Sequence, residues 1–419
     1  MEHFDVVVVG AGTAGAAAAA QLAARGLKTV CLDSRPLGES GARWVNGVAE
    51  AAFVDAGVAV PAGEELRSRD HRFQLVCGWG PDRVTVEGHG VLDVDMRLLV
   101  ARLQESAVAR GARLIGGARV AGLQGDVLST NVGEFRARWF VDASGLSGAN
   151  LLGSPSVPRE DLCSAAQEVR QVTNHAAARA FFERHGAGPG DAVCFTSVAG
   201  GYSIVNVRLE DDHVSILTGS IPGLGHPSGR QLIDRFVHEN RFVGDVIFGG
   251  VRAIPLSRPR DRLVLGRTIA IGDAAGQVFS AHGSGIGAGM VAARLLADAL
   301  EREAPHDYAV RWQRSYGSVF AAYDVFRRLS QTLTQGEVRE LMRAGLIDAA
   351  STSAAMQQQL PDMGVRPLVA RLRAASRAPA LASRLVPALV RMLAVTAAYR
   401  RYPRDPARLD VWASWARRL

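Results

Sequence analysis

Apolar runs at the start of the chain are separated by glycines and predict a strand, a helix and a second strand. Residues 6–9 form a continuous β-branched run, which is the pattern of a parallel strand buried on both faces. Alanines dominate residues 16–24 and favour a helix, and residues 29–32 form a second apolar strand pattern. This order predicts the first unit of a parallel α/β sheet.

The patterns that follow predict a different fold inserted into the first. Further strands are predicted over residues 73–77, 83–86, 113–115, 119–121 and 135–141, with a helix over 95–111. Residues 161–182 predict a helix, and strands follow over 192–197, 202–208 and 213–218, which is an α+β insertion. The first pattern then returns with strands over 262–265 and 268–271 and a helix over 286–300. Residues 306–419 are predicted to be mostly helical, interrupted by Pro361 and Pro367.

A glycine-rich turn joins the first strand to the first helix and predicts a dinucleotide site. In the segment Gly10 to Gly15, which includes Ala14, Gly10 can make the tight turn and Gly12 lets the backbone approach a pyrophosphate. Gly15 lets the helix pack closely on the strand, and the helix N-terminus faces the phosphates. Asp33 ends the second strand, and its carboxylate can accept both hydroxyls of a ribose without a 2′-phosphate.

Two later segments extend the same nucleotide site. Small residues at the carboxyl end of a parallel strand leave space for a nucleotide, and the strand over 135–141 ends in Asp142, Ala143, Ser144 and Gly145. Gly272 and Asp273 directly follow the strand over 268–271. A helix is predicted to begin after Gly283 and Gly285, near Ile286. We therefore expect a discontinuous nucleotide-binding domain of residues 1–154 with 262–305, an inserted substrate domain of 155–261 and a helical region of 306–419.

Composition supports a globular enzyme. The length of 419 residues predicts about two to three domains, and the contents of 48% hydrophobic and 21% charged residues are ordinary for such proteins. The four cysteines are scattered without a metal-binding pattern, so we expect no metal and a reducing cytoplasm. The apolar residues 6–24 follow Glu2 and Asp5 and are broken by glycines, and no later apolar run is long enough for a span.

The C-terminal region is strongly basic. From residue 371 onwards there are eleven arginines against two aspartates, whereas the whole chain has a net charge of +7. Apolar residues from Leu385 to Tyr399 recur at helical spacing, which predicts an amphipathic helix with arginines beside its apolar face. A helical subdomain packed on the enzyme is the simplest interpretation, and contact with a membrane surface or a carrier is the alternative. Nucleic acid is not expected, because no aromatic platform is present.

Together these motifs resemble the flavoproteins of the para-hydroxybenzoate hydroxylase fold, and within them the geranylgeranyl reductase group. The resemblance covers about residues 4–330 and also rests on Gly38-Glu39-Ser40 and on Gly200-Gly201-Tyr202-Ser203. It implies a Rossmann-like FAD-binding domain, with Asp273 on the ribityl chain and the helix after Gly285 directed at the flavin ring. It also implies cofactor contacts at Glu39 and Ser40, and we assign further contacts to Ser34, Arg35 and Val120.

The chain departs from the family in two places. Ser280 replaces the usual proline, with His282 two positions later, and the family's helix arginine is shifted by one place to Arg97. Halogenation is disfavoured, because such enzymes are thought to need a lysine near the reaction and the single lysine, Lys28, lies on the nucleotide side. Aromatic hydroxylation with NAD(P)H and O2 is the stronger alternative, and a non-redox cyclase is a further one.

The favoured interpretation is a single-component FAD oxidoreductase acting on a hydrophobic small molecule, such as a prenyl, polyene or other secondary-metabolite-like substrate. Hydride transfer from flavin N5 to one alkene carbon would require an acid for the other carbon. His282 is the first candidate for that acid, because histidine titrates near neutrality, and Tyr202 is the second. No second dinucleotide motif is present, so NAD(P)H has no domain of its own. The electron donor is therefore expected to be transiently bound NAD(P)H or a protein.

Overall fold

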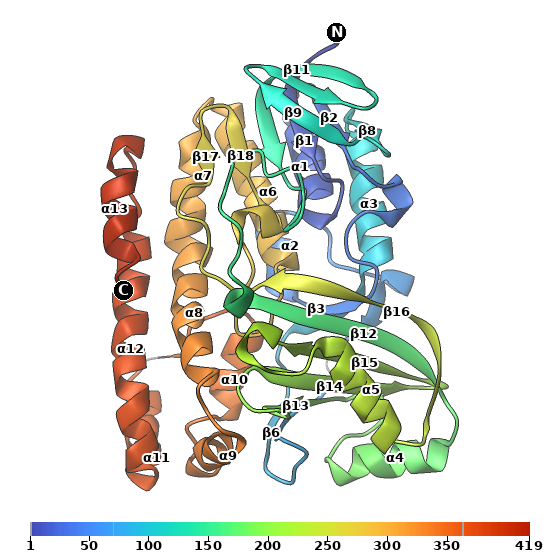
Figure 1. Cartoon of the computed structure of the whole chain (residues 1–419), viewed down its shortest axis with the longest axis vertical. Helices are drawn as coiled ribbons and strands as arrows, with labels where there is room; N and C mark the ends of the chain where they lie inside the picture. The colour runs from blue at the N-terminus through green and yellow to red at the C-terminus, as the bar shows by residue number, and fades with distance from the viewer. Residues whose placement is uncertain (1, 70, 363) are drawn as a thin grey trace.

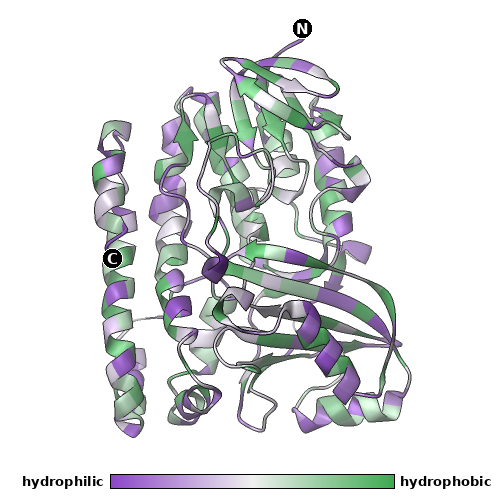
Figure 2. Cartoon of the chain, in the orientation of Figure 1, coloured by the Kyte–Doolittle hydropathy of each residue, from purple (hydrophilic) through white to green (hydrophobic). Residues whose placement is uncertain are grey.

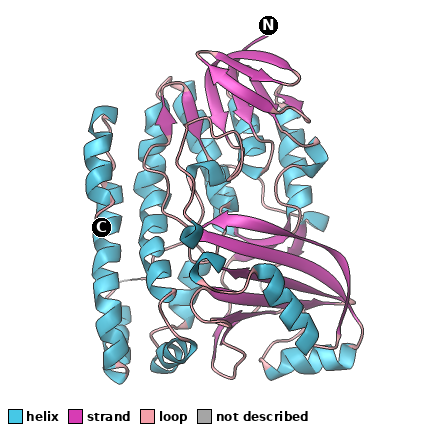
Figure 3. Ribbon diagram, in the orientation of Figure 1, coloured by secondary structure: helices cyan, strands magenta, loops and turns pink. Residues whose placement is uncertain are grey.

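A computed structural model describes residues 2–69, 71–362 and 364–419. The chain forms an upper α/β region, a lower region built on a second sheet, and a column of C-terminal helices along one side (Figure 1). Figure 3 shows that the helical column spans the height of both regions, so the C-terminal helices flank the nucleotide-binding sheet as well as the second sheet. The mixed α/β class predicted from the sequence is confirmed.

The upper sheet is mainly parallel and has β1 (Glu2–Val9) near its centre. Its strand order is β17-β18-β11-β1-β2-β8. β1 pairs in parallel with β2 (Thr29–Leu32) and with β11 (Gly133–Asp142), so their carboxyl ends meet at one edge. The outer strands are β8 (Arg113–Ile115), β18 (Thr268–Ala270) and the antiparallel β17 (Val264–Leu265), and a hairpin of β9 (Val120–Gln124) and β10 (Val127–Thr130) extends β11.

Three helices pack together beside this sheet and complete the nucleotide-binding unit. They are α1 (Thr13–Ala23), α3 (Met96–Ala109) and α6 (Ile286–Glu301), with α1 in contact with both of the others. Most of the alanines along α1 are buried. Their small side chains allow α1 to pack closely on its neighbours. The main core therefore runs from β1 through α1 and α6 to the C-terminal helices.

The second sheet has the order β16-β12-β15-β14-β13-β5-β6. The helix expected over 161–182 is wrong: residues 162–172 form a strand, and only the end of that range is helical. Helix-favouring alanines, glutamine and glutamate are overridden because this strand pairs on both edges. Its strands are β12 (Leu162–Val172), β13 (Ala192–Thr196), β14 (Ser203–Glu210), β15 (His213–Ser220) and β16 (Val243–Pro255), with α4 (His175–Arg184) and α5 (Gly229–Glu239).

The last two strands of the second sheet come from the N-terminal part of the chain. β5 (Phe73–Cys77) pairs in parallel with β13, and β6 (Arg83–Val86) pairs with β5. Residues 73–86 therefore join the second sheet, although the sequence placed them in the FAD-binding domain. A small sheet of β3 (Val45–Ala49), β4 (Leu66–Ser68) and β7 (Val91–Asp95) connects the two regions. The short α2 (Glu50–Ala56) follows β3, and α3 follows β7.

The C-terminal region is helical, as predicted. Its members are α7 (Pro305–Trp312), α8 (Ser318–Ser330), α9 (Gln335–Ala344), α10 (Ala349–Met356), α11 (Val365–Arg377), α12 (Pro379–Arg400) and α13 (Leu409–Ala416). Pro361 lies between two helices, but Pro367 lies in the first turn of α11, where a missing N–H is tolerated. Among the described residues, α12 is long and apolar enough to cross a membrane by length and composition alone. The sequence predicted no such segment, because arginines interrupt the apolar residues of α12.

Candidate functional site

The glycine turn after β1 brings the first two nucleotide segments together. Gly10 has a φ of +105°, and a Cβ there would lie 2.3 Å from the carbonyl oxygen of Ala143. A Cβ on Gly15 would lie 1.7 Å from the carbonyl oxygen of Gly10. Neither position can hold a side chain without moving backbone. The turn 10–15 and the segment 142–145 therefore form one surface, as the sequence predicted.

Asp33 holds its carboxylate at the N-terminal end of α1. It is 6% exposed, and its two oxygens accept hydrogen bonds from the backbone N–H groups of Ala11 at 2.8 Å and Arg35 at 2.9 Å. Each oxygen keeps a further lone pair for a ribose hydroxyl. The Asp33 carbonyl also accepts from Ala118 N at 2.8 Å, which places the stretch leading to Val120 beside it. Ser34 and Arg35 follow on the exposed side.

The loop containing Glu39 and Ser40 closes over the glycine turn. A Cβ on Gly12 would lie 3.1 Å from the Cα of Gly41, so the two backbones nearly touch. Ser40 is buried and Glu39 is exposed. Gln104 of α3, which the sequence did not single out, donates to the carbonyls of Ala11 at 2.9 Å and Leu37 at 3.1 Å and so fixes the loop to the turn.

Asp142 stabilises its own loop. One carboxylate oxygen accepts from the N–H and the hydroxyl of Ser144, at 3.1 and 2.5 Å, and the other accepts from Leu151 N at 2.8 Å. The residue is 1% exposed. Contacts from this segment to a nucleotide are therefore expected from the backbone of residues 143–145 and not from the Asp142 carboxylate.

Asp273 lies on a short turn that a buried chain of hydrogen bonds supports. Gly272 N donates to Gln277 Oε1 at 2.7 Å, and Gln277 Nε2 donates to the Tyr308 hydroxyl at 2.8 Å. The Asp273 carboxylate faces the start of α6, since a Cβ on Gly285 would lie 3.4 Å from its Oδ1. Burial raises the pKa of Asp273. A buried acceptor of this kind is stabilised by hydroxyl donors, such as those of a ribityl chain.

Arg252 is a site residue that the sequence did not reveal. It lies on β16 and donates from Nη2 towards the carbonyl of Gly41 at 3.4 Å. It is also the charge that counteracts burial at Asp273 by lowering the pKa of that carboxyl group. One arginine of the second sheet thus reaches the pyrophosphate loop and the ribityl end. In the structure Arg252 and Ile254 share the less exposed face of β16, and no pattern in the sequence indicated this.

Arg97 makes a different contact from the expected one. Its guanidinium pairs with Asp95, with distances of 3.1 Å from Nε to Oδ1 and 2.7 Å from Nη2 to Oδ2, and it lies 5.3 Å from the centre of the Phe248 ring. Burial alone would raise the pKa of Asp95, but hydrogen bonds from Arg97 and Arg67 lower it to about 2. The Arg97 guanidinium is held by this ion pair, and its contact with the flavin stays a prediction.

The loop between Phe279 and α6 carries the departures from the family pattern. Ser280 is fully buried, and its hydroxyl has no hydrogen-bond partner among the described residues. The His282 ring packs on Phe279 with ring centres 4.8 Å apart. His282 is an exposed residue, but the protein around its ring desolvates it enough to lower the pKa of His282 to about 4, against a hydrogen bond with the Ala355 backbone. His282 is therefore neutral at pH 7.

The loop ends in an uncapped helix N-terminus. Gly283 has a φ of +73°, and no side chain caps α6 at Gly285. The first backbone N–H groups of α6, beginning at Ile286, lack partners within the helix. These N–H groups and the helix dipole favour an anionic group next to them. The end of α6 thus offers the environment that the sequence predicted for a flavin ring.

Tyr202 lies against the same loop. A Cβ on Gly283 would be 3.6 Å from the Tyr202 hydroxyl, and the residue is 8% exposed. It packs in an apolar cluster with Cys163, Val278 and Ile254. Burial raises the pKa of Tyr202 well above 10, so its hydroxyl keeps the proton at neutral pH. The structure therefore brings both predicted catalytic residues to one loop.

These features fit FAD along its whole length. Asp33 and residues 117–120 suit the adenosine, the 10–15 turn suits the pyrophosphate, Asp273 suits the ribityl chain, and the N-terminus of α6 suits the ring. No group of three or more His, Cys, Asp or Glu side chains in the described part of the chain could hold a metal ion.

Comparisons with known proteins agree with this assignment. The family described as FAD binding domain matches residues 5–185. The chain is 25% identical to the digeranylgeranylglycerophospholipid reductase of Sulfolobus acidocaldarius, over 98% of the chain and 95% of the relative. A geranylgeranyl bacteriochlorophyll reductase-like protein from Thermoplasma acidophilum has a similar structure, with 18% identity, a TM-score of 0.73, and coverage of 93% of this chain and 100% of that one.

A probable FAD-dependent monooxygenase from Pseudomonas aeruginosa shares the fold more distantly. It is 18% identical with a TM-score of 0.59, covering 81% of this chain and 98% of that one. At this identity the likeness concerns the fold alone. The family match and the reductase relative together make the chain an FAD-dependent oxidoreductase, and the resemblance seen in the sequence is confirmed.

Proposed function

We propose that this FAD-dependent oxidoreductase reduces carbon–carbon double bonds in a prenyl or polyene lipid. The observation that carries the proposal is the apolar cluster around Tyr202, which places one protonated hydroxyl among aliphatic and thiol side chains beside the 282–285 loop. An apolar wall with one polar group suits a hydrocarbon chain that must be oriented. The name of the Sulfolobus relative, which matches almost the full length, supports the same substrate class.

The protein's own residues would supply the proton. FAD, when bound, supplies hydride transfer to carbon. Reduction of one double bond then needs a proton for the second carbon, and we assign it to the Tyr202 hydroxyl, which keeps its proton because burial raises its pKa. His282 becomes the second candidate, since its lowered pKa leaves no imidazolium to donate at pH 7. We assign His282 to the surface that the substrate would contact beside the 282–285 loop.

Electrons must also enter the protein for each turnover. Each double bond consumes two electrons and two protons, so a reductant is needed in stoichiometric amount. We propose NAD(P)H or a reduced protein as the donor. A cyclase would consume none, so the reductant stoichiometry separates these two activities.

Halogenation finds no support in the position of Lys28. Its Nζ lies 4.9 Å from the centre of the Phe4 ring and 3.9 Å from Glu2 Oε1, near the start of β1. The glycine turn follows the other end of β1, roughly 20 Å away at the usual rise of a strand. The lysine amine is therefore remote from the loop at His282.

The test is anaerobic turnover of the holoenzyme with a polyprenyl lipid and chemically reduced flavin. We expect the product to gain one H2 for each double bond reduced, measured by mass spectrometry. Incorporation of an oxygen atom when air is admitted, without saturation under anaerobic conditions, would establish hydroxylation instead. Omission of the reductant is the control, and turnover without it would identify a cyclase.

We further propose that the protein is cytoplasmic and contacts the membrane surface through α12. Val386, Leu389, Val390 and Leu393 are all more than half exposed and form one stripe at spacings of three and four. The opposite side of the helix is held by the protein, since α12 packs on α8. Figure 2 shows many hydrophobic residues along this outermost column of helices. Arginines at both ends of the stripe favour an anionic surface.

A further inference from the structure

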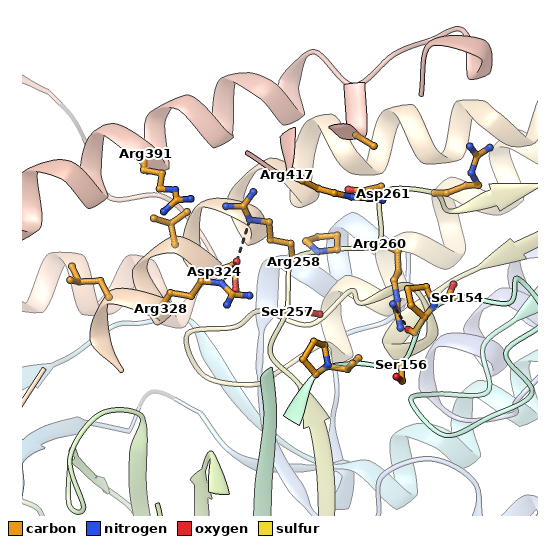
Figure 4. Close-up of a pocket in the computed structure, with 18 of the residues that line it drawn as sticks. Ser154, Ser156, Ser257, Arg258, Arg260, Asp261, Asp324, Arg328, Arg391 and Arg417 are labelled. Carbon is orange, nitrogen blue, oxygen red and sulfur yellow. Dashed lines mark hydrogen bonds and ion pairs between the residues drawn. The ribbon is translucent and has the colours of Figure 1, made fainter. Parts of the chain in front are cut away.

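A pocket lies beside the turn that carries Asp273, away from the 282–285 loop. It has a volume of about 1040 Å³ and is lined by two connecting segments, residues 154–158 and 257–262, together with α8, α12 and α13. The residues that line it include seven arginines and three aspartates. Figure 4 shows side chains from all of these elements directed towards a common space. The pocket is large enough for a nucleotide or a lipid headgroup.

Several of these arginines are already neutralised by carboxylates. Their pairs are Arg258–Asp324 at 3.2 Å, Arg262–Asp410 at 2.7 Å, Arg328–Asp324 at 3.0 Å and Arg417–Asp261 at 2.6 Å. These pairs fix the walls of the pocket. Arg384 pairs with Glu337, which lies outside the pocket lining. Arg260 and Arg391 are the two lining arginines for which no ion pair with an aspartate or glutamate is formed among the described residues.

Arg260 is the clearest uncompensated charge. Its Nη1 donates to the carbonyl of Pro155 at 2.7 Å, and no carboxylate of the described residues lies within ion-pair distance of it. Burial lowers the pKa of this guanidinium, and the nearby charge of Asp261 only partly opposes that effect. Partial burial of the Arg260 charge without an anion costs desolvation free energy, and a bound anion would offset that free energy.

Arg391 enters from the opposite wall. It belongs to the face of α12 that lines the pocket, with Arg384, Pro387 and Ala388 at helical spacings of three and four. Its Nε donates to the backbone oxygen of Leu419, and its guanidinium is exposed at the pocket. Two arginines from separate elements therefore flank the same space (Figure 4).

The neutral lining also suits a phosphorylated ligand. Ser154, Ser156 and Ser257 contribute hydroxyl groups near Arg260 (Figure 4), while Leu329 and Ala413 add apolar surface. We propose that this pocket binds a phosphate or diphosphate group. Arginine forks and hydroxyl donors are the usual ligands of phosphate oxygens, and a diphosphate offers more acceptor oxygens to them than a carboxylate does.

The pocket is linked by backbone hydrogen bonds to the turn that carries Asp273. The Arg260 N–H donates to the carbonyl of Ala275 at 3.0 Å, and Gln313 Nε2 donates to the carbonyl of Arg260 at 2.8 Å. The backbone of Arg260 thus touches the turn of Asp273 on one side and presents its side chain to the pocket on the other. A ligand held by Arg260 would act on the same backbone that positions Asp273.

The test measures binding to the oxidised holoenzyme by calorimetry. The probes are inorganic diphosphate, NADP⁺ and a short prenyl diphosphate, which share the phosphate chemistry and represent a free anion, a dinucleotide and a lipid. We expect inorganic diphosphate to bind, with affinity that falls as salt increases. The probe with the highest affinity identifies the source of the phosphate group. Arg260→Gln and Arg391→Gln should each weaken binding about tenfold or more.

Arg179→Gln is the matched control, because Arg179 is an exposed arginine of α4 away from the pocket. It should bind all three probes like the unmodified protein. The flavin spectrum and content show whether each variant is folded, and Arg391 is exposed, so its replacement leaves the core intact. Absence of diphosphate binding, binding that survives both pocket substitutions, or an equal loss in Arg179→Gln would each overturn the proposal.

Discussion

The hydroxyl of Tyr308 accepts a hydrogen bond from Gln277 Nε2 and donates one to the carbonyl of Ala270, both at 2.8 Å. Through Gln277 Oε1, which accepts from Gly272 N, this hydroxyl supports both sides of the turn that carries Asp273. Tyr308 belongs to α7 and is fully buried, so it cannot touch a cofactor itself. The C-terminal helical region therefore helps to shape the FAD site.

Tyr308→Phe should weaken FAD binding although it removes no cofactor contact. The substitution leaves Gln277 Nε2 and the Ala270 carbonyl buried without a partner, at a cost of about 1–3 kcal/mol. We expect a several-fold higher dissociation constant for FAD, measured by flavin fluorescence, and a lower melting temperature. Tyr316→Phe is the control, because the Tyr316 hydroxyl bonds Asp55 and not the turn. Equal FAD affinity in both variants would contradict this role of Tyr308.

Asp273→Asn should have a larger effect on FAD. The substitution keeps the shape of the side chain but removes the charged acceptor that faces Gly285. Hydrogen bonds to a charged group contribute about 1.5–3 kcal/mol, so we expect a dissociation constant for FAD raised by about tenfold to a hundredfold. Asp245→Asn, at an exposed position of β16, should leave FAD binding unchanged. A dissociation constant in Asp273→Asn equal to that of the control would remove Asp273 from the site.

The local parts of this site could be predicted from the sequence, whereas its distant parts could not. Gly10, Gly15 and Asp33 act within one strand–helix–strand unit, so their spacing alone defines their roles. Arg252 reaches the cofactor region only because β16 pairs with β12, a strand whose residues were predicted to form a helix. The role of Tyr308 likewise depends on how α7 packs, which no local pattern encodes.

Local patterns do not show which partners a side chain will have. Asp142 and Arg97 stand at positions where a cofactor contact is expected, and each also bonds a neighbouring group of the protein. A carboxylate that ends a strand can bond either a ligand or its own loop, and the sequence does not distinguish these outcomes. The choice is made by the fold around it.

Tyr202→Phe should lower turnover by about a hundredfold or more while FAD binding is unchanged, because general acids typically contribute factors of 10² to 10⁴. The ring and its packing with Cys163 and Val278 are kept, so the loss reports on the hydroxyl. Single-turnover reduction of the lipid after anaerobic mixing is the measurement. A rate within a factor of about two of the unmodified enzyme would exclude Tyr202 as the proton donor.

The pH dependence separates Tyr202 from His282. The pKa of His282 is lowered to about 4, so its imidazolium is lost as the pH rises through that value and is absent at neutrality. The reduction rate should therefore not fall between about pH 5.5 and 7.5, as it would for a histidine acid with an ordinary pKa. His282→Gln should keep most of the activity. A rate that falls with an apparent pKa near 6.5, and loses this dependence in His282→Gln, would restore His282 as the acid.

His71 should make the protein less stable in acid. Burial lowers its pKa to about 4, against the attraction of Asp93, and Arg208 Nη2 lies 3.0 Å from His71 Nε2, which must accept from it without a proton. Between about pH 6.5 and 4 His71 is protonated in the unfolded chain but not in the folded chain. The free energy of unfolding should therefore fall by roughly 3 kcal/mol as the pH is lowered through this window. Denaturant unfolding should show a shallower pH slope in His71→Gln, and the exposed His175→Gln should retain the full slope.

Leu389 and Leu393 test the contact between α12 and the membrane. They are 51% and 58% exposed, and burial of each in a lipid surface would contribute about 1.5–3 kcal/mol at most. The double variant Leu389→Glu/Leu393→Glu should therefore lose at least about tenfold in binding to anionic vesicles in a sedimentation assay. Val108→Glu, on the equally exposed surface of α3, should bind as before. A different result would be that the unmodified protein does not bind vesicles and forms a dimer in light scattering, and that the double variant is a monomer. The exposed stripe of α12 would then be the interface between two copies of the chain.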